Sequence, residues 1–412
     1  MNADGLLQED ELNRLHFIPC YFGKPAMRAS VVISALVAVL VGFGGTLALI
    51  IAAAQAVGAD TAQTASWVTA LCLSMAASTA ILSIRHRIPI ITAWSTPGAA
   101  LLAASSGVSF EAAVGAFIVA ALLILITAVF RPVAALIEKI PTAIASAMLA
   151  GVLFGFVIAV FEHLQATPAL VLPLVIAFAV LRIFSPSWAV LAVLALGVAL
   201  AVFLNMTAPI DDLHLSGLVW VVPVFDTTTL IGIGLPLYLV TMASQNLPGF
   251  AVLKSAGYRV PSRSILTVTG LSSLLTAFVG AHTSNLAAIT ASICTNPDAH
   301  PDKDKRWLGG PVYAAGYGVL ALFGASLVTL FASFPHGLIA TIAGIALIGP
   351  LVGALSSSLE TPDHRFAGVT TFAVTASGLS VFGIGSAFWG LVAGLIVYGL
   401  EHARVRLNQS DP

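Results

Sequence analysis

The chain has 412 residues, of which 58% are hydrophobic and 8% are charged, and its formal net charge at pH 7 is −1. Its mean hydropathy is +1.01, whereas soluble domains carry roughly 25% charged residues. This composition indicates an integral membrane protein and leaves no soluble domain of any size. We expect no nucleic-acid partner.

The first 28 residues are polar and acidic, and they lack the basic region, short apolar stretch and small-residue cleavage site of a signal peptide. We therefore expect a cytosolic N-terminal tail over 1–28. The cysteines Cys20, Cys72 and Cys294 are far apart and have no metal-ligand spacing. Neither a disulfide framework nor a metal site is predicted, and no motif calls for a cofactor.

Apolar stretches of about 15 to 25 residues then recur along the chain, a length typical of membrane-spanning helices rather than of barrel strands. Charged residues, Pro, Gly and Asn separate these stretches into fourteen segments. The first seven lie near 30–54, 63–84, 89–106, 111–130, 140–161, 167–183 and 187–205. The second seven lie near 228–253, 262–280, 283–296, 308–333, 336–356, 366–382 and 385–401.

The positions of the basic residues predict how these segments are oriented. With a cytosolic N-terminus, all 17 Lys and Arg residues fall on the cytosolic side of the fourteen-segment arrangement, as expected because Lys and Arg concentrate in cytoplasmic loops. We therefore predict a multi-pass membrane protein with both termini cytosolic. The halves 29–206 and 227–406, joined by an extracytoplasmic link at 207–226, hold seven segments each. They would enter the membrane from opposite sides, as in the inverted repeats of many secondary transporters.

The third segment contains the stretch ITAWSTPGAA, residues 91–100, which interrupts an apolar run. We expect extended chain from Pro89, and then a helix start with Ser95 or Thr96 as N-cap and Pro97 in the first turn. The resulting half-helix would begin near the membrane centre, with its free N–H groups and positive dipole end facing inward. The alternative is that Pro97 only kinks a packed helix.

The tenth segment shows a similar interruption. In Gly280-Ala-His-Thr-Ser-Asn, Thr283 or Ser284 is expected to cap a half-helix from Asn285 to Ile293 that is too short to span the membrane. Two opposed half-helix N-termini would form an anion-binding site at the midplane.

Three stretches resemble a known family: ITAWSTPGAALL at 91–102, TMASQNLPGFAVLK at 241–254, and NLAAITASICTNPDAHPDKDKRW at 285–307. They are similar to the bacterial benzoate transporters of the BenE type, which are benzoate:proton symporters. This resemblance implies an all-α, 14-segment, 7+7 inverted-repeat fold, shared with nucleobase permeases and sulfate or bicarbonate transporters, with short strands before the half-helices of segments 3 and 10. It also implies a core domain (29–130 and 227–334) that moves against a gate domain (139–206 and 335–406) in an elevator-like motion, commonly within a homodimer.

The resemblance and the residues together predict the substrate. Nucleobase permeases of this fold place acidic residues in the eighth and tenth segments, where this chain has neutral side chains instead. A buried carboxylate would repel a carboxylate substrate, whereas neutral donors and two dipole ends attract one. Aromatic side chains would supply an apolar slot, although ordinary packing is the alternative for Phe43 and Tyr238. The residues expected to bind an aromatic carboxylate are Phe43, Trp94, Ser95, Thr96, Gly98, Tyr238, Gln245, Asn246, His282, Thr283, Ser284 and Asn285.

Proton coupling is expected because moving a monovalent anion inward against 100 mV costs about 2.3 kcal/mol. His282 is the candidate carrier, since imidazole titrates near neutral pH. It could instead donate a hydrogen bond as a neutral ring. The competing functions are a passive anion channel, an inorganic anion transporter and a nucleobase transporter. A membrane enzyme is disfavoured, because the sequence has no H-E-x-x-H, G-x-S-x-G or Walker motif.

Overall fold

The structure is a computed structural model that describes residues 28–44, 46–130, 141–184, 186–208, 215–382 and 384–410. The expected tail at 1–28 lies outside the described residues except for its last residue. Part of the expected link and the loop at 131–140 lie outside them as well.

Helices dominate the described chain. The first half contains α2 (Ala29–Gly44), α3 (Leu47–Ala56), α4 (Thr61–His86), α5 (Thr96–Ala103), α6 (Phe110–Val129), α8 (Thr142–Ala166), α9 (Pro168–Phe184) and α10 (Pro186–Phe203). The second half contains α11 (Thr227–Thr229), η2 (Leu230–Gly234), α12 (Leu235–Thr241), η3 (Met242–Asn246), α13 (Leu247–Ser255), α14 (Ser262–Ala277), α15 (Ile289–Thr295), η4 (Lys303–Leu308), α16 (Gly309–Leu322), α17 (Gly324–Ala332), α18 (His336–Leu359), η5 (Pro362–His364), α19 (Arg365–Ala376) and α20 (Ser386–Ser410). Two strands, β1 (Thr92–Trp94) and β2 (Ser284–Leu286), form one antiparallel sheet.

Local sequence explains several of the helix starts. Asp60 and Gln63 form a reciprocal capping box at the start of α4, with bonds of 2.7 and 2.9 Å. Ser109 caps α6 by accepting a bond from the backbone N–H of Ala112. Because these signals lie within one helical turn, they are visible in the sequence.

Seven helices in the described part of the chain are long and apolar enough to cross a membrane, or eight if the pair formed by residues 303–322 and 324–332 counts as one bent span. Six of the fourteen expected segments hold only shorter helices, of 7 to 18 residues. The protein is therefore a mostly helical, multi-pass membrane protein.

Two expected segments are not single straight helices. The stretch expected at 30–54 is divided into α2 and α3 next to a glycine-rich sequence, and the Thr46 hydroxyl bonds back to the Gly42 carbonyl there (2.7 Å). The segment expected at 308–333 bends by 60° between α16 and α17, at Phe323. The segment at 227–255 is continuous, but π-turns η2 and η3 interrupt its α-helical pattern.

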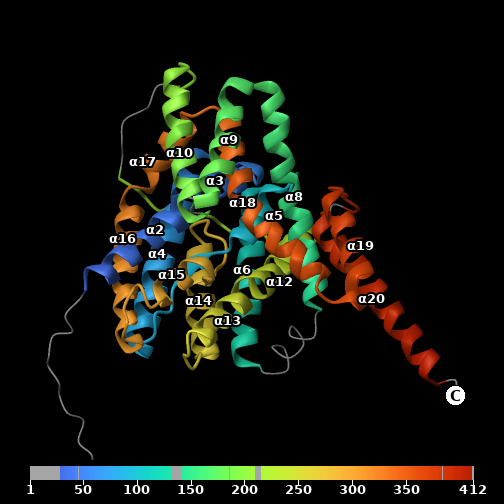
Figure 1. The fold of residues 1–412 in the computed structure, drawn as a ribbon. Helices are drawn as coiled ribbons and strands as arrows, with labels where there is room; N and C mark the ends of the chain where they lie inside the picture. Colours follow the sequence, from blue (N-terminus) through green and yellow to red (C-terminus); the bar gives the residue numbers. More distant parts are fainter. Residues whose placement is uncertain are drawn as a thin grey trace, which may run out of the picture.

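The helices pack into two groups (Figure 1). In one group α4 contacts α16 and α14, α14 contacts α6, and α2 contacts α16 and α15. In the other group α8 contacts α18, α19 and α20. Gly344 of α18 allows a close approach to α8, since a methyl group there would clash with the carbonyl oxygen of Phe156 and with Val160. Helices α3 and α5 and the turn η3 lie where the groups meet, because they contact α18 or α8.

Candidate functional site

The strand pair lies in the interior of the first helix group. Ala93 is opposite Asn285 in the antiparallel register, and Trp94 is opposite Ser284. The strands expected in segments 3 and 10 are thus present, and each leads into a short helix. Because the strands run in opposite directions, α5 and α15 begin at opposite ends of a ladder about 10 Å long.

Ser95, one of the two residues predicted as the cap, is the N-cap of α5, which begins at Thr96. Its Oγ accepts a hydrogen bond from the backbone N–H of Gly98 (3.1 Å), and Pro97 follows in the first turn. The hydroxyl of Thr241 donates to the same Ser95 oxygen (2.9 Å) and is bonded to Thr283 Oγ1 (2.8 Å). The start of α5 is therefore tied to the end of α12 and to the chain just before β2.

The predicted start of the second half-helix is wrong. Helix α15 begins at Ile289 rather than at Asn285, and Ala288 occupies its N-cap position without a side-chain cap. Pairing with β1 draws residues 284–286 into the ladder, which delays the first helical turn. The Ser284 hydroxyl bonds to Ser74 of α4 (2.7 Å), so it is not available to cap α15.

His282 is fully buried, and both of its ring nitrogens have partners. The indole N–H of Trp67 donates to Nδ1 (3.0 Å), and Nε2 lies 3.0 Å from the carbonyl oxygen of Ser95. An indole nitrogen only donates and a carbonyl only accepts, so this arrangement requires the neutral ring with its proton on Nε2. The ring also meets Trp67 and Phe117 edge-on. In this conformation His282 joins the chain before β2 to α4 and to the start of α5.

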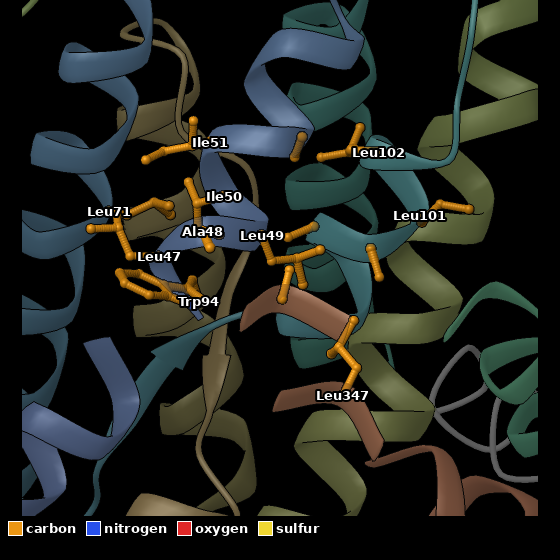
Figure 2. Packing of buried hydrophobic residues seen from close by; sticks show 14 of the residues in the cluster. Leu47, Ala48, Leu49, Ile50, Ile51, Leu71, Trp94, Leu101, Leu102 and Leu347 are labelled. Atoms are coloured by element: carbon orange, nitrogen blue, oxygen red, sulfur yellow. The ribbon is translucent and has the colours of Figure 1, made fainter. Parts of the chain in front are cut away.

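Trp94 is buried at the end of β1 among aromatic and aliphatic side chains. Its ring centroid lies 5.8 Å from that of Phe43 and 6.2 Å from that of Tyr317. The indole N–H donates to the hydroxyl of Thr46 (2.9 Å). Figure 2 shows Trp94 beside Leu47 of α3. The predicted partners Phe43 and Trp94 are thus brought together, and Tyr317 of α16 joins them.

Three amide side chains, those of Gln245, Asn246 and Asn285, lie next to one another at β2. Asn246 Oδ1 accepts the backbone N–H of Leu286 (3.0 Å), so it completes the outer edge of β2. Asn285 Nδ2 donates to the Leu286 carbonyl (2.9 Å) and contacts Gln245 Oε1 at 3.5 Å. Gln245 is half-buried, whereas Asn246 and Asn285 are fully buried. Of the three, Gln245 is therefore the most accessible.

The remaining predicted residues have different surroundings. Thr96 is half-buried in the first turn of α5. Gly98 allows α12 to approach, since a methyl group there would clash with Leu237 and lie 2.8 Å from Ser95 Oγ. The hydroxyl of Tyr238 bonds to Thr127 of α6 (2.5 Å). The aromatic role expected for Tyr238 stays a prediction.

A buried cation holds the far end of α15. Arg306 donates from Nε to the His300 carbonyl (2.6 Å) and from Nη1 to the Thr295 carbonyl (2.7 Å). Thr295 is the last residue of α15, where a positive charge is favoured by the helix dipole. Asn296 and Asp302 cap turns in the same loop, so its Asp and His residues serve the loop's own fold.

A carboxylate caps the start of the segment at 227–255. Asp226 Oδ2 accepts from the backbone N–H and from the hydroxyl of Thr229, both at 2.8 Å. These hydrogen bonds stabilise the ionised form and hold the pKa of Asp226 below its usual value.

Comparisons with known proteins show the family of this chain. Residues 26–400 match the family model described as BenE, benzoate membrane transport protein. The chain is 39% identical to the inner membrane protein YdcO of Escherichia coli strain K12 over 368 residues, which are 89% of this chain and 94% of that protein. It is 35% identical to the benzoate membrane transport protein of Acinetobacter baylyi over 371 residues, 90% of this chain and 94% of that protein.

This chain belongs to the BenE family. The family is one of membrane transporters rather than of enzymes, so the protein is a membrane transporter. The resemblance carried by residues 91–102, 241–254 and 285–307 is thereby confirmed.

Two solved structures that share the fold are those of the SLC26A9 anion transporter and of a bicarbonate transporter. The overall structure of SLC26A9 aligns with a TM-score of 0.62 and 12% identity, over 90% of this chain and 65% of that one. The transmembrane domain of the cyanobacterial bicarbonate transporter BicA aligns with a TM-score of 0.56 and 15% identity, over 88% and 97%. At these identities the likeness shows the fold alone.

Sequence reasoning about this BenE-family chain missed most of the partners of the predicted residues. Trp67, Thr46 and Thr241 each bond directly to a predicted residue. In α4, the hydroxyls of Ser78 and Thr79 both bond to Thr92 Oγ1 at 2.7 Å. The available signal was a series of small hydroxyl residues in α4, an otherwise apolar segment.

Proposed function

We propose that the protein imports benzoate, or a similar aromatic carboxylate, together with protons across the bacterial inner membrane. Membership of the BenE family supports a benzoate substrate. Accumulation of an anion against an inside-negative potential needs an energy source, and a co-transported proton supplies it.

The observation that carries the proposal is the neutral polar chemistry of the region where β1, β2 and η3 meet, which we call the strand crossing. Residues 91–98, 241–246 and 282–290 contain no Asp, Glu, Lys or Arg. Their polar side chains are hydroxyls, amides and one imidazole, and α15 begins without a side-chain cap. Such a site offers hydrogen-bond donors to the carboxyl group of an aromatic acid without burying a charged side chain beside it.

The hydroxyl of Ser95 is suited to contact the carboxylate. It accepts bonds from Gly98 and Thr241, so its own hydrogen is left to donate. The half-buried Gln245 lies on the same segment as Thr241 and next to Asn285. We propose that Ser95, Thr96 and Gln245 contact the carboxylate, whereas Asn246, Thr283, Ser284 and Gly98 hold the crossing together.

The aromatic ring of the substrate is proposed to lie on the side of the crossing where Trp94 and Phe43 meet. An apolar slot with a few convergent polar groups is the usual form of a site for an aromatic ligand. An inorganic anion would gain nothing from these rings, and this difference favours benzoate over sulfate or bicarbonate.

The architecture proposed for transport is the fourteen-segment inverted repeat with both termini cytosolic. Strands followed by short helices in the third and tenth segments support the repeat. The packing of the helices into two groups supports a core (29–130 and 227–334) and a gate (139–206 and 335–406), and an elevator-like motion between them would carry the site across the membrane. A homodimer is proposed by analogy with the fold.

The test is uptake of radiolabelled benzoate into proteoliposomes, with and without an inward proton gradient. Gradient-driven accumulation that unlabelled benzoate blocks, and that sulfate and uracil do not, is the expected result. Uptake that only equilibrates would indicate a channel. Competition by sulfate or uracil would assign the site to a different substrate class.

Two variants connect uptake to the site. Gln245→Ala should weaken benzoate binding by about 1 to 3 kcal/mol if its amide bonds the carboxylate in a dry site. Ser95→Ala should weaken binding by a similar amount and also destabilise the start of α5, because the cap is lost. Lys254→Ala, at the far end of the same segment, is the control. Unchanged benzoate affinity in both site variants, measured by calorimetry, would remove these residues from the site.

A further inference from the structure

Two buried side-chain oxygens in the described part of the crossing have no hydrogen-bond partner: Asn285 Oδ1 in β2 and Thr290 Oγ1 in α15. Asn285 Oδ1 is inaccessible to solvent and accepts no hydrogen bond within the described part of the chain. The orientation of this amide follows from its other contact: the Leu286 carbonyl can only accept, so the nitrogen of Asn285 must face it. The oxygen is consequently an acceptor that still needs a donor.

The missing partner constrains the protonation state of the ligand. An ionised carboxylate carries only acceptor atoms, and it would repel the Asn285 oxygen. A neutral carboxylic acid carries one O–H donor in addition to an acceptor oxygen. Asn285 lies at the middle of the ladder, opposite the half-buried Ala93 and beside the half-buried Gln245.

Among the described residues, no side-chain proton carrier on the elements packed against β2 faces Asn285. The elements packed against β2 are β1, η3, α4, α14 and α13. Their titratable or charged residues are Cys72, Arg85, His86, Lys254 and Arg263, and Lys254 is exposed near the end of α13. Helices α4 and α14 reach β2 through Ser74 and Ser273. Arg85, His86 and Arg263 are ten or more residues from these contacts, which is about 15 Å or more along a helix. Cys72 is two positions from Ser74 and so points to a different side of α4.

His282, three positions before Asn285, is the titratable residue nearest to it along the chain. Its Nδ1 already accepts the Trp67 N–H, and its Nε2 already faces the Ser95 carbonyl. A second proton on this ring would have to displace the Trp67 bond.

We propose that the substrate itself carries the proton, and that it is bound as the neutral acid with its O–H donating to Asn285 Oδ1. This inference rests on the proposed benzoate transport. Outside the cell the carboxylate takes a proton from water and an O–H bond forms. Inside the cell that bond breaks and the proton returns to water. One benzoate and one proton cross together, and the complex that crosses is uncharged.

Ligand binding to purified wild-type protein tests the proposal without any variant. Benzamide is a neutral analogue with an N–H donor and a carbonyl acceptor, whereas benzenesulfonate is an anion at every accessible pH. We expect the apparent Kd of benzoate to rise about tenfold per pH unit above the pKa of the free acid, because the neutral acid becomes that much scarcer. Benzamide should compete equally well at every pH, and benzenesulfonate should not compete.

Variants then locate the effect. Asn285→Leu should remove most of the affinity for benzamide. Ser74→Ala is the control, because it removes the hydrogen bond to Ser284 on the opposite face of β2. This variant should keep the wild-type ratio of benzamide to benzoate affinity and the wild-type dependence of the benzoate Kd on pH. His282→Gln should keep the tenfold slope.

The outcomes separate two kinds of failure. Benzoate binding that does not vary with pH, with benzenesulfonate competing and benzamide not, would overturn the proton assignment while leaving benzoate transport intact. Loss of the slope in His282→Gln would overturn it in favour of a side-chain carrier. A protein that neither binds nor accumulates benzoate at any pH would instead overturn the proposed function.

Discussion

The bond between Trp67 and His282 offers the sharpest test of how the crossing is held. In Trp67→Phe the N–H donor is lost, and His282 Nδ1 is left buried without a partner. Both side chains are fully buried, and the donor–acceptor distance is 3.0 Å. Losing one partner of a buried hydrogen bond costs about 1 to 3 kcal/mol. The smaller ring still packs against Phe110 and Phe117, so we expect packing loss to add only about 1 kcal/mol.

The free energy of unfolding can be measured by titration with SDS in mixed micelles, followed by far-ultraviolet circular dichroism. Trp220→Phe is the matched control, because Trp220 is 65% exposed and stacks on Phe278, and it should cost less than about 0.5 kcal/mol. In a His282→Leu background, Trp67→Phe should cost only the packing loss, which gives a coupling energy of about 1 kcal/mol or more. Equal costs in both backgrounds would refute the proposed role of the hydrogen bond.

Three further predictions concern other parts of the molecule. Gly344→Ala should destabilise the protein by about 1 to 3 kcal/mol, since the added methyl group clashes with α8. Gly349→Ala on the same helix has open space and should cost nothing in the same SDS titration. Arg306→Gln should cost about 2 to 4 kcal/mol, because charge-assisted bonds to buried carbonyls are lost. Lys305→Gln, which breaks an ion pair that is half exposed, should cost less than about 1 kcal/mol, and equal losses for the two would contradict the role given to Arg306. The pKa of Asp226 is lowered in the folded protein, so its contribution to stability is present at neutral pH and is lost as the pH falls below the usual carboxylate range. Asp226→Asn should therefore flatten the loss of stability in acid, and an unchanged acid profile would contradict this.

Local signals in the sequence were reliable where the interacting groups lie within one helical turn. The start of α5 was predicted from Ser95 and Pro97, because an N-cap and a proline act through residues next to them. The same reasoning failed for α15, where pairing with β1 competes with helix formation. A strand partner about 190 residues away leaves no mark on the local pattern around Ser284.

The sequence by itself determined that this is a multi-pass helical membrane protein of the BenE family with neutral polar groups at two breaks. Hydropathy, charge placement and short motifs carry that information, since each depends on the residue types alone. Only the tertiary structure decided which of those groups are already paired. Trp67 is hydrogen-bonded to His282, Thr127 to Tyr238, and Ser74 to Ser284. The side-chain oxygen of Asn285 has no hydrogen-bond partner in the described part of the chain. The physical reason is that a buried polar atom is satisfied by whatever the packing of distant helices brings within hydrogen-bonding distance.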